Sequence, residues 1–282
     1  MDAFAAIQAG LADGRVVPYL GPGVLALAGE GCPLPASPQA LVKHLIAKAS
    51  VPHKLHGNLT AAAQFIENFK HRKTVAAAMR EAFAPAVAPT ALHTWLAAQP
   101  SVPLLVHAWY DDLPQRALAA RPGWGALQGV SQAEHAGAWC HAFDAAGNLV
   151  PAQAAQDWDT VLYQPLGSVA PAGNFLVSDS DFVEVMTEID IQTPIPAEVQ
   201  RRRAGRQFLF LGCRFDDQLT RTFARQVMKR SSDQHYAVLP ETPSRNEARF
   251  LEQQNIEVLR LPLTDFVAEL TGEARLAEAM AG

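Results

Sequence analysis

The chain has 282 residues, of which 49% are hydrophobic and 18% charged, and its formal net charge is -5. This composition excludes an intrinsically disordered chain, which needs low hydrophobicity and high charge. The mild acidity gives no basis for non-specific nucleic-acid binding, and no run approaches the roughly 20 apolar residues of a membrane span.

The N-terminal region predicts a short helix followed by a strand and a glycine turn. Residues 1–4 lack the positive segment of a signal peptide, so we expect a cytoplasmic protein. Residues 4–13 place apolar side chains on one helical face. The apolar run 15–20 ends in Gly21-Pro22-Gly23, an order typical of nucleotide-binding α/β units. Gly21 and Gly23 would let the backbone approach a phosphate, and a tight turn without a ligand is the alternative.

Residues 38–98 are predicted to form a helical insertion or cap beside the sheet. Stretches 38–49, 58–70 and 73–84 each carry an apolar face, and Thr90 can cap a fourth helix.

Strand patterns return after this insertion. Turn residues 144–148 separate two short strands, which predicts a β-hairpin. Residues 119–137, rich in glycine, alanine and glutamine, are interpreted as a surface excursion, and 119–158 as a hairpin-bearing excursion of the domain. The expected strands are 102–106, 138–143, 149–150, 160–163 and 174–177.

The C-terminal third alternates strands with helices. Its strongest strand is 207–211, directly followed by Gly212. The elements after it are a helix around 219–228, strand 235–239, helix 244–254, strand 256–259 and helix 264–270. This alternation predicts an α/β fold with helices on both faces of a mainly parallel, Rossmann-like sheet of about six strands, within a single domain spanning 1–282.

Polar residues follow two of the predicted strands. Asp111 and Asp112 are candidates for helix capping, ribose binding or acid/base chemistry, and capping is the simpler interpretation for Asp112. His107 is a candidate base or a buried hydrogen-bonded histidine. Gly167 and Ser168 would offer an N–H group and a hydroxyl to a phosphate, or form an ordinary turn.

Taken in order, four strand-end motifs resemble those of bacterial SIR2-like domains, which are sirtuin relatives without the zinc module and are common in NAD-hydrolysing defence proteins. The motifs are 21–25, 107–111, 165–168 and 210–216, and residues 88–93, 174–182 and 256–258 are also similar to the family. The resemblance implies a SIR2-type fold and a site for NAD or an ADP-ribose-like nucleotide, with no zinc. It implies binding residues Gly21, Gly23, Trp109, Tyr110, Asp111, Gly167, Ser168, Gly212 and Asp216.

Three positions depart from the family pattern. The family's catalytic asparagine falls on Trp109, its histidine base on Leu166, and the serine of its first motif on Leu25. Indole and aliphatic side chains cannot replace an amide or an imidazole in hydrogen bonding and proton transfer. We therefore expect a pseudoenzyme that binds a nucleotide in a regulatory or sensing role, with Trp109 stacking on the ligand or blocking it.

Two alternatives stay open for this site. One is an active NAD glycohydrolase or other nucleotide hydrolase in which His107 or Asp111 acts as the base. The other is an interaction scaffold with a dead nucleotide site.

Other polar residues have both functional and structural interpretations. Arg201-Arg202-Arg203 is usually a solvated face, but it would also suit a protein partner or a phosphate. Cys213 beside Arg214 is either a reactive thiol or a small core residue. His53 and His56 lack nearby cysteines or paired carboxylates, and the chain has no Cys-x-x-Cys pair, so we expect no metal site.

Overall fold

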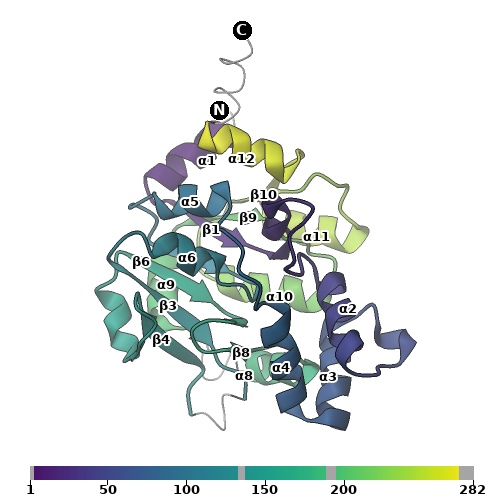
Figure 1. The fold of residues 1–282 in the computed structure, drawn as a ribbon. Helices are drawn as coiled ribbons and strands as arrows, with labels where there is room; N and C mark the ends of the chain where they lie inside the picture. The colour runs from purple at the N-terminus through teal and green to yellow at the C-terminus, as the bar shows by residue number, and fades with distance from the viewer. Residues whose placement is uncertain (1–2, 133–136, 189–194, 273–282) are drawn as a thin grey trace.

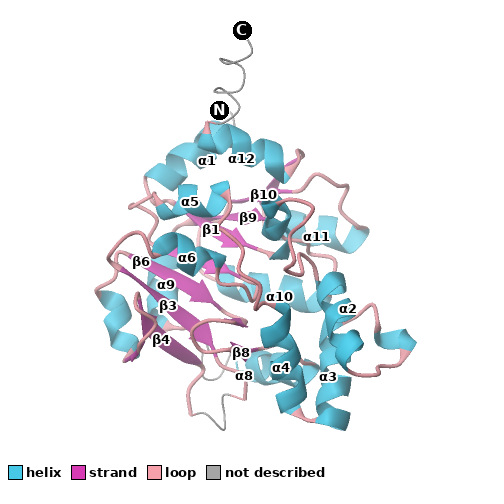
Figure 2. Ribbon diagram, viewed as in Figure 1, coloured by secondary structure: helices cyan, strands magenta, loops and turns pink. Residues whose placement is uncertain are grey.

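The computed structural model describes residues 3–132, 137–188 and 195–272. A nine-stranded sheet with the order β11-β10-β9-β1-β2-β6-β3-β4-β5 forms its centre, with helices on both faces (Figures 1 and 2). Neighbouring strands are parallel from β11 to β3, whereas β4 and β5 are antiparallel. The predicted Rossmann-like fold is confirmed, with a larger sheet than the sequence indicated. The strands of this sheet are β1 (Val16–Leu20), β2 (Leu104–His107), β3 (Trp124–Gly129), β4 (Cys140–Asp144), β5 (Leu149–Val150), β6 (Thr160–Gln164), β9 (Gln207–Leu211), β10 (His235–Val238) and β11 (Ile256–Leu259).

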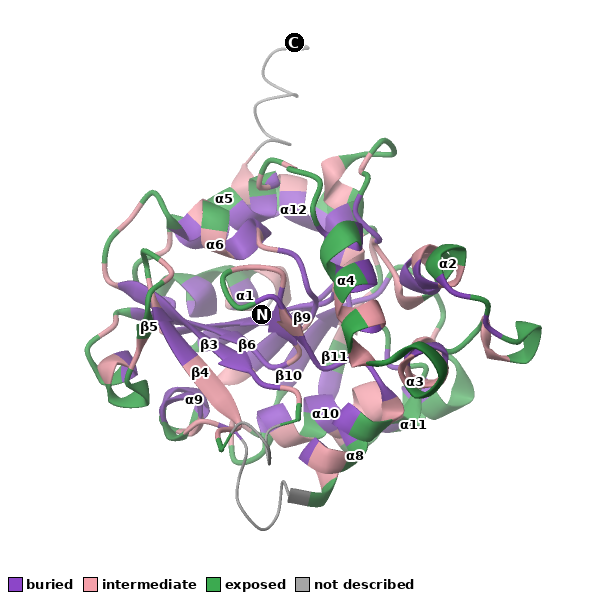
Figure 3. Ribbon diagram, turned by 60° about the horizontal axis from the view of Figure 1, so that its bottom comes forward, coloured by how far each residue is buried: buried purple, intermediate pink, exposed green. Residues whose placement is uncertain are grey.

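The central strands are buried on both faces (Figure 3). Because side chains alternate along a strand, Val17 and Tyr19 of β1 enter one core cluster while Val16 and Leu20 enter another. The first cluster is covered by α8 (Asp179–Glu188), α9 (Ala197–Arg203), α10 (Gln218–Met228) and α11 (Arg245–Gln253). The second is covered by α1 (Ala3–Ala12), α5 (Ala91–Ala97), α6 (Leu113–Leu118) and α12 (Leu263–Thr271).

A block of three helices stands beside the sheet, at the lower right of Figure 1. This helical block consists of α2 (Pro38–Lys48), α3 (Leu59–Lys70) and α4 (Arg72–Ala82), which contact one another. Ser37 and Asn58 cap α2 and α3, because their side chains accept hydrogen bonds from the first-turn N–H groups of those helices. Helix α5 packs mainly against α6 and α12.

Strand β3 contradicts the expectation of a surface excursion at 119–137. It is buried along its whole length and pairs with β6 and β4 inside the sheet. Its small residues permit close packing, since a Cβ on Gly125 would lie 2.3 Å from the indole of Trp158. The glycine and alanine residues that suggested a surface loop therefore belong to a tightly packed strand. Residues 133–136 lie outside the described residues.

The β4–β5 hairpin is confirmed, with Phe143 paired to Leu149. A separate two-stranded sheet joins β7 (Gly167–Ser168) to β8 (Asn174–Phe175). None of the described helices is both long and apolar enough to cross a membrane.

Candidate functional site

The four sequence motifs meet at one edge of the sheet. They follow β1, β2, β6 and β9, which are mutually parallel, and β1 lies between β9 and β2. Because the carboxyl ends of parallel strands share an edge, the loops after these strands are neighbours. We call them the strand-end loops.

The glycines of the first and fourth motifs pack on each other. The Gly21 N–H donates to Leu211 O at 2.9 Å, and the Gly23 N–H donates to Gly212 O at 2.9 Å. Gly212 has a φ of +62°, and a Cβ there would lie 2.4 Å from Val24 N. These glycines therefore let two loops approach backbone to backbone, and the N–H groups of Gly21 and Gly23 have protein partners instead of facing a phosphate. This geometry favours the tight-turn interpretation.

Trp109 points into the protein toward the helical block. Its side chain is 3% exposed, and its Nε1 donates to Pro35 O at 2.8 Å. The indole also contacts the rings of Phe83 and Tyr110, at centroid distances of 6.1 and 4.9 Å. Tyr110 is equally buried, and its hydroxyl donates to Leu176 O at 2.8 Å. The structure thus places both aromatic side chains in the core.

The three positions that the sequence resemblance marks as departures share one apolar region of the core. Leu25 and Trp109 belong to a third core cluster, and Leu166 packs against it. The same cluster contains the inward faces of the helical block, including Leu41, Ile66 and Met79. The third core cluster therefore joins the helical block to the strand-end loops through apolar contacts.

His107 and Asp111 form a buried pair. Both residues are 1% exposed, and the distance from His107 Nε2 to Asp111 Oδ2 is 3.1 Å. Burial by itself would raise the pKa of Asp111, but the charge and hydrogen bond of His107 outweigh it and leave that pKa below its usual value. Asp111 Oδ1 also accepts the N–H of Leu113, so Asp111, not Asp112, caps α6 with its side chain.

A second buried histidine, His93, lies near this pair and was missed by the sequence analysis. Its Nδ1 is 2.8 Å from Thr90 Oγ1, within a capping box at the start of α5. Burial lowers the pKa of His93 to about 4, so its ring is neutral at pH 7. Within the described part of the chain, His93 Nε2 and His107 Nδ1 have no hydrogen-bond partner. The sequence could have revealed this contact, because His93 stands three residues after Thr90, which is the spacing of a capping box.

Ser168 faces inward, where its hydroxyl lies 3.2 Å from Asp111 O. Beside it are three glutamines that the sequence analysis did not single out. Gln115 Nε2 and Gln128 Nε2 both donate to Gln164 Oε1, at 2.7 and 2.8 Å. The preceding Gly167 has a φ of +77°, and a Cβ there would meet Asn174 O. These contacts give Gly167 and Ser168 structural roles in the turn.

In the fourth motif, Asp216 is exposed, and the neighbouring Asp217 caps α10 by accepting the N–H of Thr220 at 2.8 Å. Cys213 is buried, and burial raises the pKa of its thiol, which favours the interpretation as a small core residue. Arg214 is held by Glu247 through two hydrogen bonds of 3.2 and 3.1 Å.

The arginine triplet is largely internal, which corrects its interpretation as a solvated basic face. Arg202 is buried and donates to the carbonyls of four residues and to Glu198. Arg203 is buried against the carbonyls of Gln226 and Val227. Arg201 alone of the three has an exposed side chain, paired with Glu198. Binding of a protein partner at this triplet stays a prediction, and of the three side chains only that of Arg201 is exposed enough to contact such a partner.

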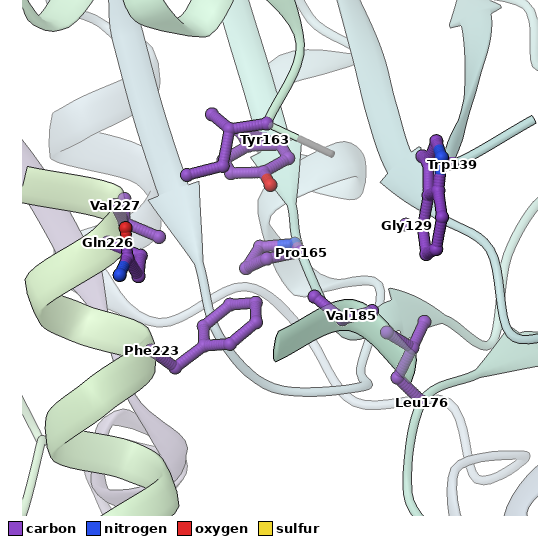
Figure 4. Close-up of a pocket in the computed structure, with 10 residues that line it drawn as sticks. Gly129, Trp139, Tyr163, Pro165, Leu176, Val185, Phe223, Gln226 and Val227 are labelled. Carbon is purple, nitrogen blue, oxygen red and sulfur yellow. The ribbon is translucent and has the colours of Figure 1, made fainter. Parts of the chain in front are cut away.

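Two cavities lie away from the strand-end glycines. One, of about 20 Å³, has room for a single water molecule, and Figure 4 shows Tyr163, Pro165 and Phe223 around it. The other, of about 1020 Å³, lies beside β3, β4 and α9. Among the described residues, no group of three or more His, Cys, Asp or Glu side chains is placed to hold a metal ion.

Comparison with known families decides the relationship. The sequence model of the SIR2-like domain matches residues 103–259, more than half of the chain. The chain belongs to the SIR2-like family. No curated protein matches it. The match includes the second, third and fourth strand-end loops of this SIR2-like domain, and it associates the chain with nucleotide ligands of the NAD type.

Proposed function

We propose that this SIR2-like protein binds a nucleotide of the NAD or ADP-ribose type without cleaving NAD, and acts as a regulatory or sensing protein. The observation that carries the proposal is the third core cluster. Leu25, Trp109 and Leu166 stand where the family pattern has polar residues, and all three contribute apolar contacts to it. A positioned general base contributes about 10²–10⁴ to a rate, and none of these side chains can act as one.

The buried pair of His107 and Asp111 is a poor substitute for the lost base. Each residue is 1% exposed, and their ring nitrogen and carboxylate are hydrogen-bonded to each other. A general base must come within about 3 Å of the proton it removes. Solvent and substrate do not reach this pair in the described conformation, which argues against a hydrolase with relocated chemistry.

A second candidate function is an interaction scaffold whose nucleotide site is dead. Two observations favour it. The N–H groups of Gly21 and Gly23 are bonded to backbone carbonyls, and Trp109 fills the region between the strand-end loops and the helical block. The two candidates differ in one measurable property, nucleotide binding.

The midpoint of thermal unfolding, Tm, measured with and without NAD, ADP-ribose or ATP, tests the proposal. A ligand present at about 100 times its Kd adds roughly 2.7 kcal/mol to the free energy of unfolding. We expect a selective rise in Tm with NAD or ADP-ribose, and no nicotinamide release from NAD. The exposed carboxylate of Asp216 lies on a strand-end loop, so Asp216→Ala should reduce the rise, whereas Asp233→Ala, an exposed carboxylate elsewhere, should not. Nicotinamide release would refute the proposal, and no rise with any nucleotide would favour the scaffold.

A further inference from the structure

The segment 173–181 connects the sheet to the helical block through polar contacts. It runs from just before β8 into the first turn of α8, and it includes the stretch that resembles the family's serine-acid motif. Helix α8 contacts α3, and β8 contacts α4. Figure 1 shows β8 beside α4, and Figure 3 shows α8 near α3. We call residues 173–181 the latch segment.

An ion pair between Arg72 and Asp181 is the central contact. Arg72, the first residue of α4, places Nη1 at 2.7 Å from Asp181 Oδ2. Its Nη2 donates to the carbonyl of Phe175. The same Asp181 oxygen accepts the N–H groups of Val177 and Ser178, at 2.8 and 2.9 Å. One carboxylate therefore fixes both the shape of the latch segment and its attachment to the block.

Further contacts flank this pair on both sides. Thr60 Oγ1, at the start of α3, donates to Asp179. Gln64 Oε1 accepts the N–H of Ser180 at 2.7 Å. Toward the other end of the latch segment, Arg80 Nη2 donates to Gly173 O at 3.0 Å. Two helices of the block are thus bound along the whole segment.

The central pair is shielded from solvent. Asp181 is 2% exposed and the Arg72 side chain 20%, so salt screens their attraction weakly. Burial would lower the pKa of Arg72, but Asp181 and Glu67 outweigh it and keep the guanidinium charged. Removing Arg72 leaves the buried Asp181 carboxylate without a cation, which is strongly unfavourable, whereas removing Asp181 leaves Arg72 paired with Glu67 alone. Loss of Arg72 therefore favours conformations in which the latch segment separates from α4 and Asp181 reaches water.

We propose that the latch segment holds the helical block closed over Trp109, and that release of the Arg72–Asp181 pair opens the block and admits a nucleotide to the strand-end loops. Closure uses this polar contact together with the third core cluster, to which the latch segment itself contributes Phe175 and Val177. The access step rests on the proposed function, whereas the opening step does not. Opening exposes Trp109 and Tyr110 together, because both side chains lie in the cluster that joins the block to the loops.

Hydrogen–deuterium exchange of the whole chain tests the opening step. In Arg72→Met, we expect amide exchange in α3, α4 and the latch segment to accelerate by at least about tenfold, while β1 and β9 exchange at the wild-type rate. The matched control is Lys48→Met, because Lys48 pairs with Glu81 between α2 and α4 and has no contact with the latch segment. This control should exchange at near the wild-type rate in all these elements. Asp181→Asn, which keeps the shape of the carboxylate, should reproduce the effect of Arg72→Met.

Thermal shift with ADP-ribose then tests the access step. A larger Tm rise in Arg72→Met than in wild type supports the proposal as a whole. Exchange that accelerates equally in β1 and β9, or not at all, overturns the latch. Accelerated exchange in the block without any ADP-ribose effect, in the variant or in wild type, supports the opening step and overturns nucleotide binding as the function.

Discussion

Replacing Trp109 by alanine tests whether this side chain fills the core between the strand-end loops and the helical block. Truncation of a buried tryptophan costs about 3–5 kcal/mol. The buried carbonyl of Pro35 also loses its partner, which adds about 1 kcal/mol. We therefore expect the free energy of unfolding to fall by about 4–6 kcal/mol. At roughly 2 °C per kcal/mol for a domain of this size, Tm falls by about 8–12 °C.

Urea unfolding followed by circular dichroism measures this loss. Trp95→Ala is the matched control, because Trp95 is only partly buried beside the second core cluster and its truncation should cost about 1–2 kcal/mol. A loss at Trp109 no larger than the loss at Trp95 would refute the reasoning. In that case the indole would not fill the core between the strand-end loops and the helical block.

Three further predictions concern features outside the third core cluster. Because burial lowers the pKa of His93 to about 4, its ring is neutral when folded but titrates near pH 6.5 when unfolded. The contribution of neutral His93 to the free energy of unfolding is therefore fully present above pH 6.5, and it falls by on the order of 3 kcal/mol as the pH drops toward 4. In urea unfolding measured at each pH, His93→Gln should make this fall smaller. Arg202→Met should cost about 3–5 kcal/mol in the same assay, since it leaves four buried or partly buried carbonyls without their donor. Arg201→Met should change stability by less than about 1 kcal/mol, and equal effects would contradict the assigned burial. Gly212→Ala places a Cβ against the backbone at a residue with a positive φ, so it should lower Tm more than the control Gly205→Ala. Gly205 has a φ of +70°, but the space around its Cβ is open. The reverse order would show that the first and fourth strand-end loops do not touch.

Much of the fold was predictable because buried parallel strands have continuous apolar sequences. The run 207–211 and the alternation after it predicted β9 to β11 and the helices between them. Strand β3 was missed because Gly125 and its small neighbours have the composition of a loop. Their role depends on the indole of Trp158, which is distant in sequence, so no local pattern reveals it.

The location of the candidate site was predictable, but the use of its residues was not. Strand ends marked by glycine or aspartate correctly indicated which loops become neighbours. The sequence does not show that the Gly23 N–H is taken by Gly212 O, or that Trp109 points inward to Pro35. Arg202 is a similar case, because its acceptors come from segments before β2 and before β6. Such roles depend on long-range contacts, which local sequence does not encode.

The shared packing of Leu25, Trp109 and Leu166 in the third core cluster has a consequence for how these positions can change. Side chains that share a cluster affect stability non-additively, so the effect of restoring a polar residue at one of them depends on the other two. A histidine placed alone at the half-buried Leu166 would give up apolar packing against this cluster, which costs stability. Mutational paths that introduce polar residues at these positions therefore pass through less stable proteins. Such dependence between positions favours variants that keep the apolar cluster and change the outer surface of the protein.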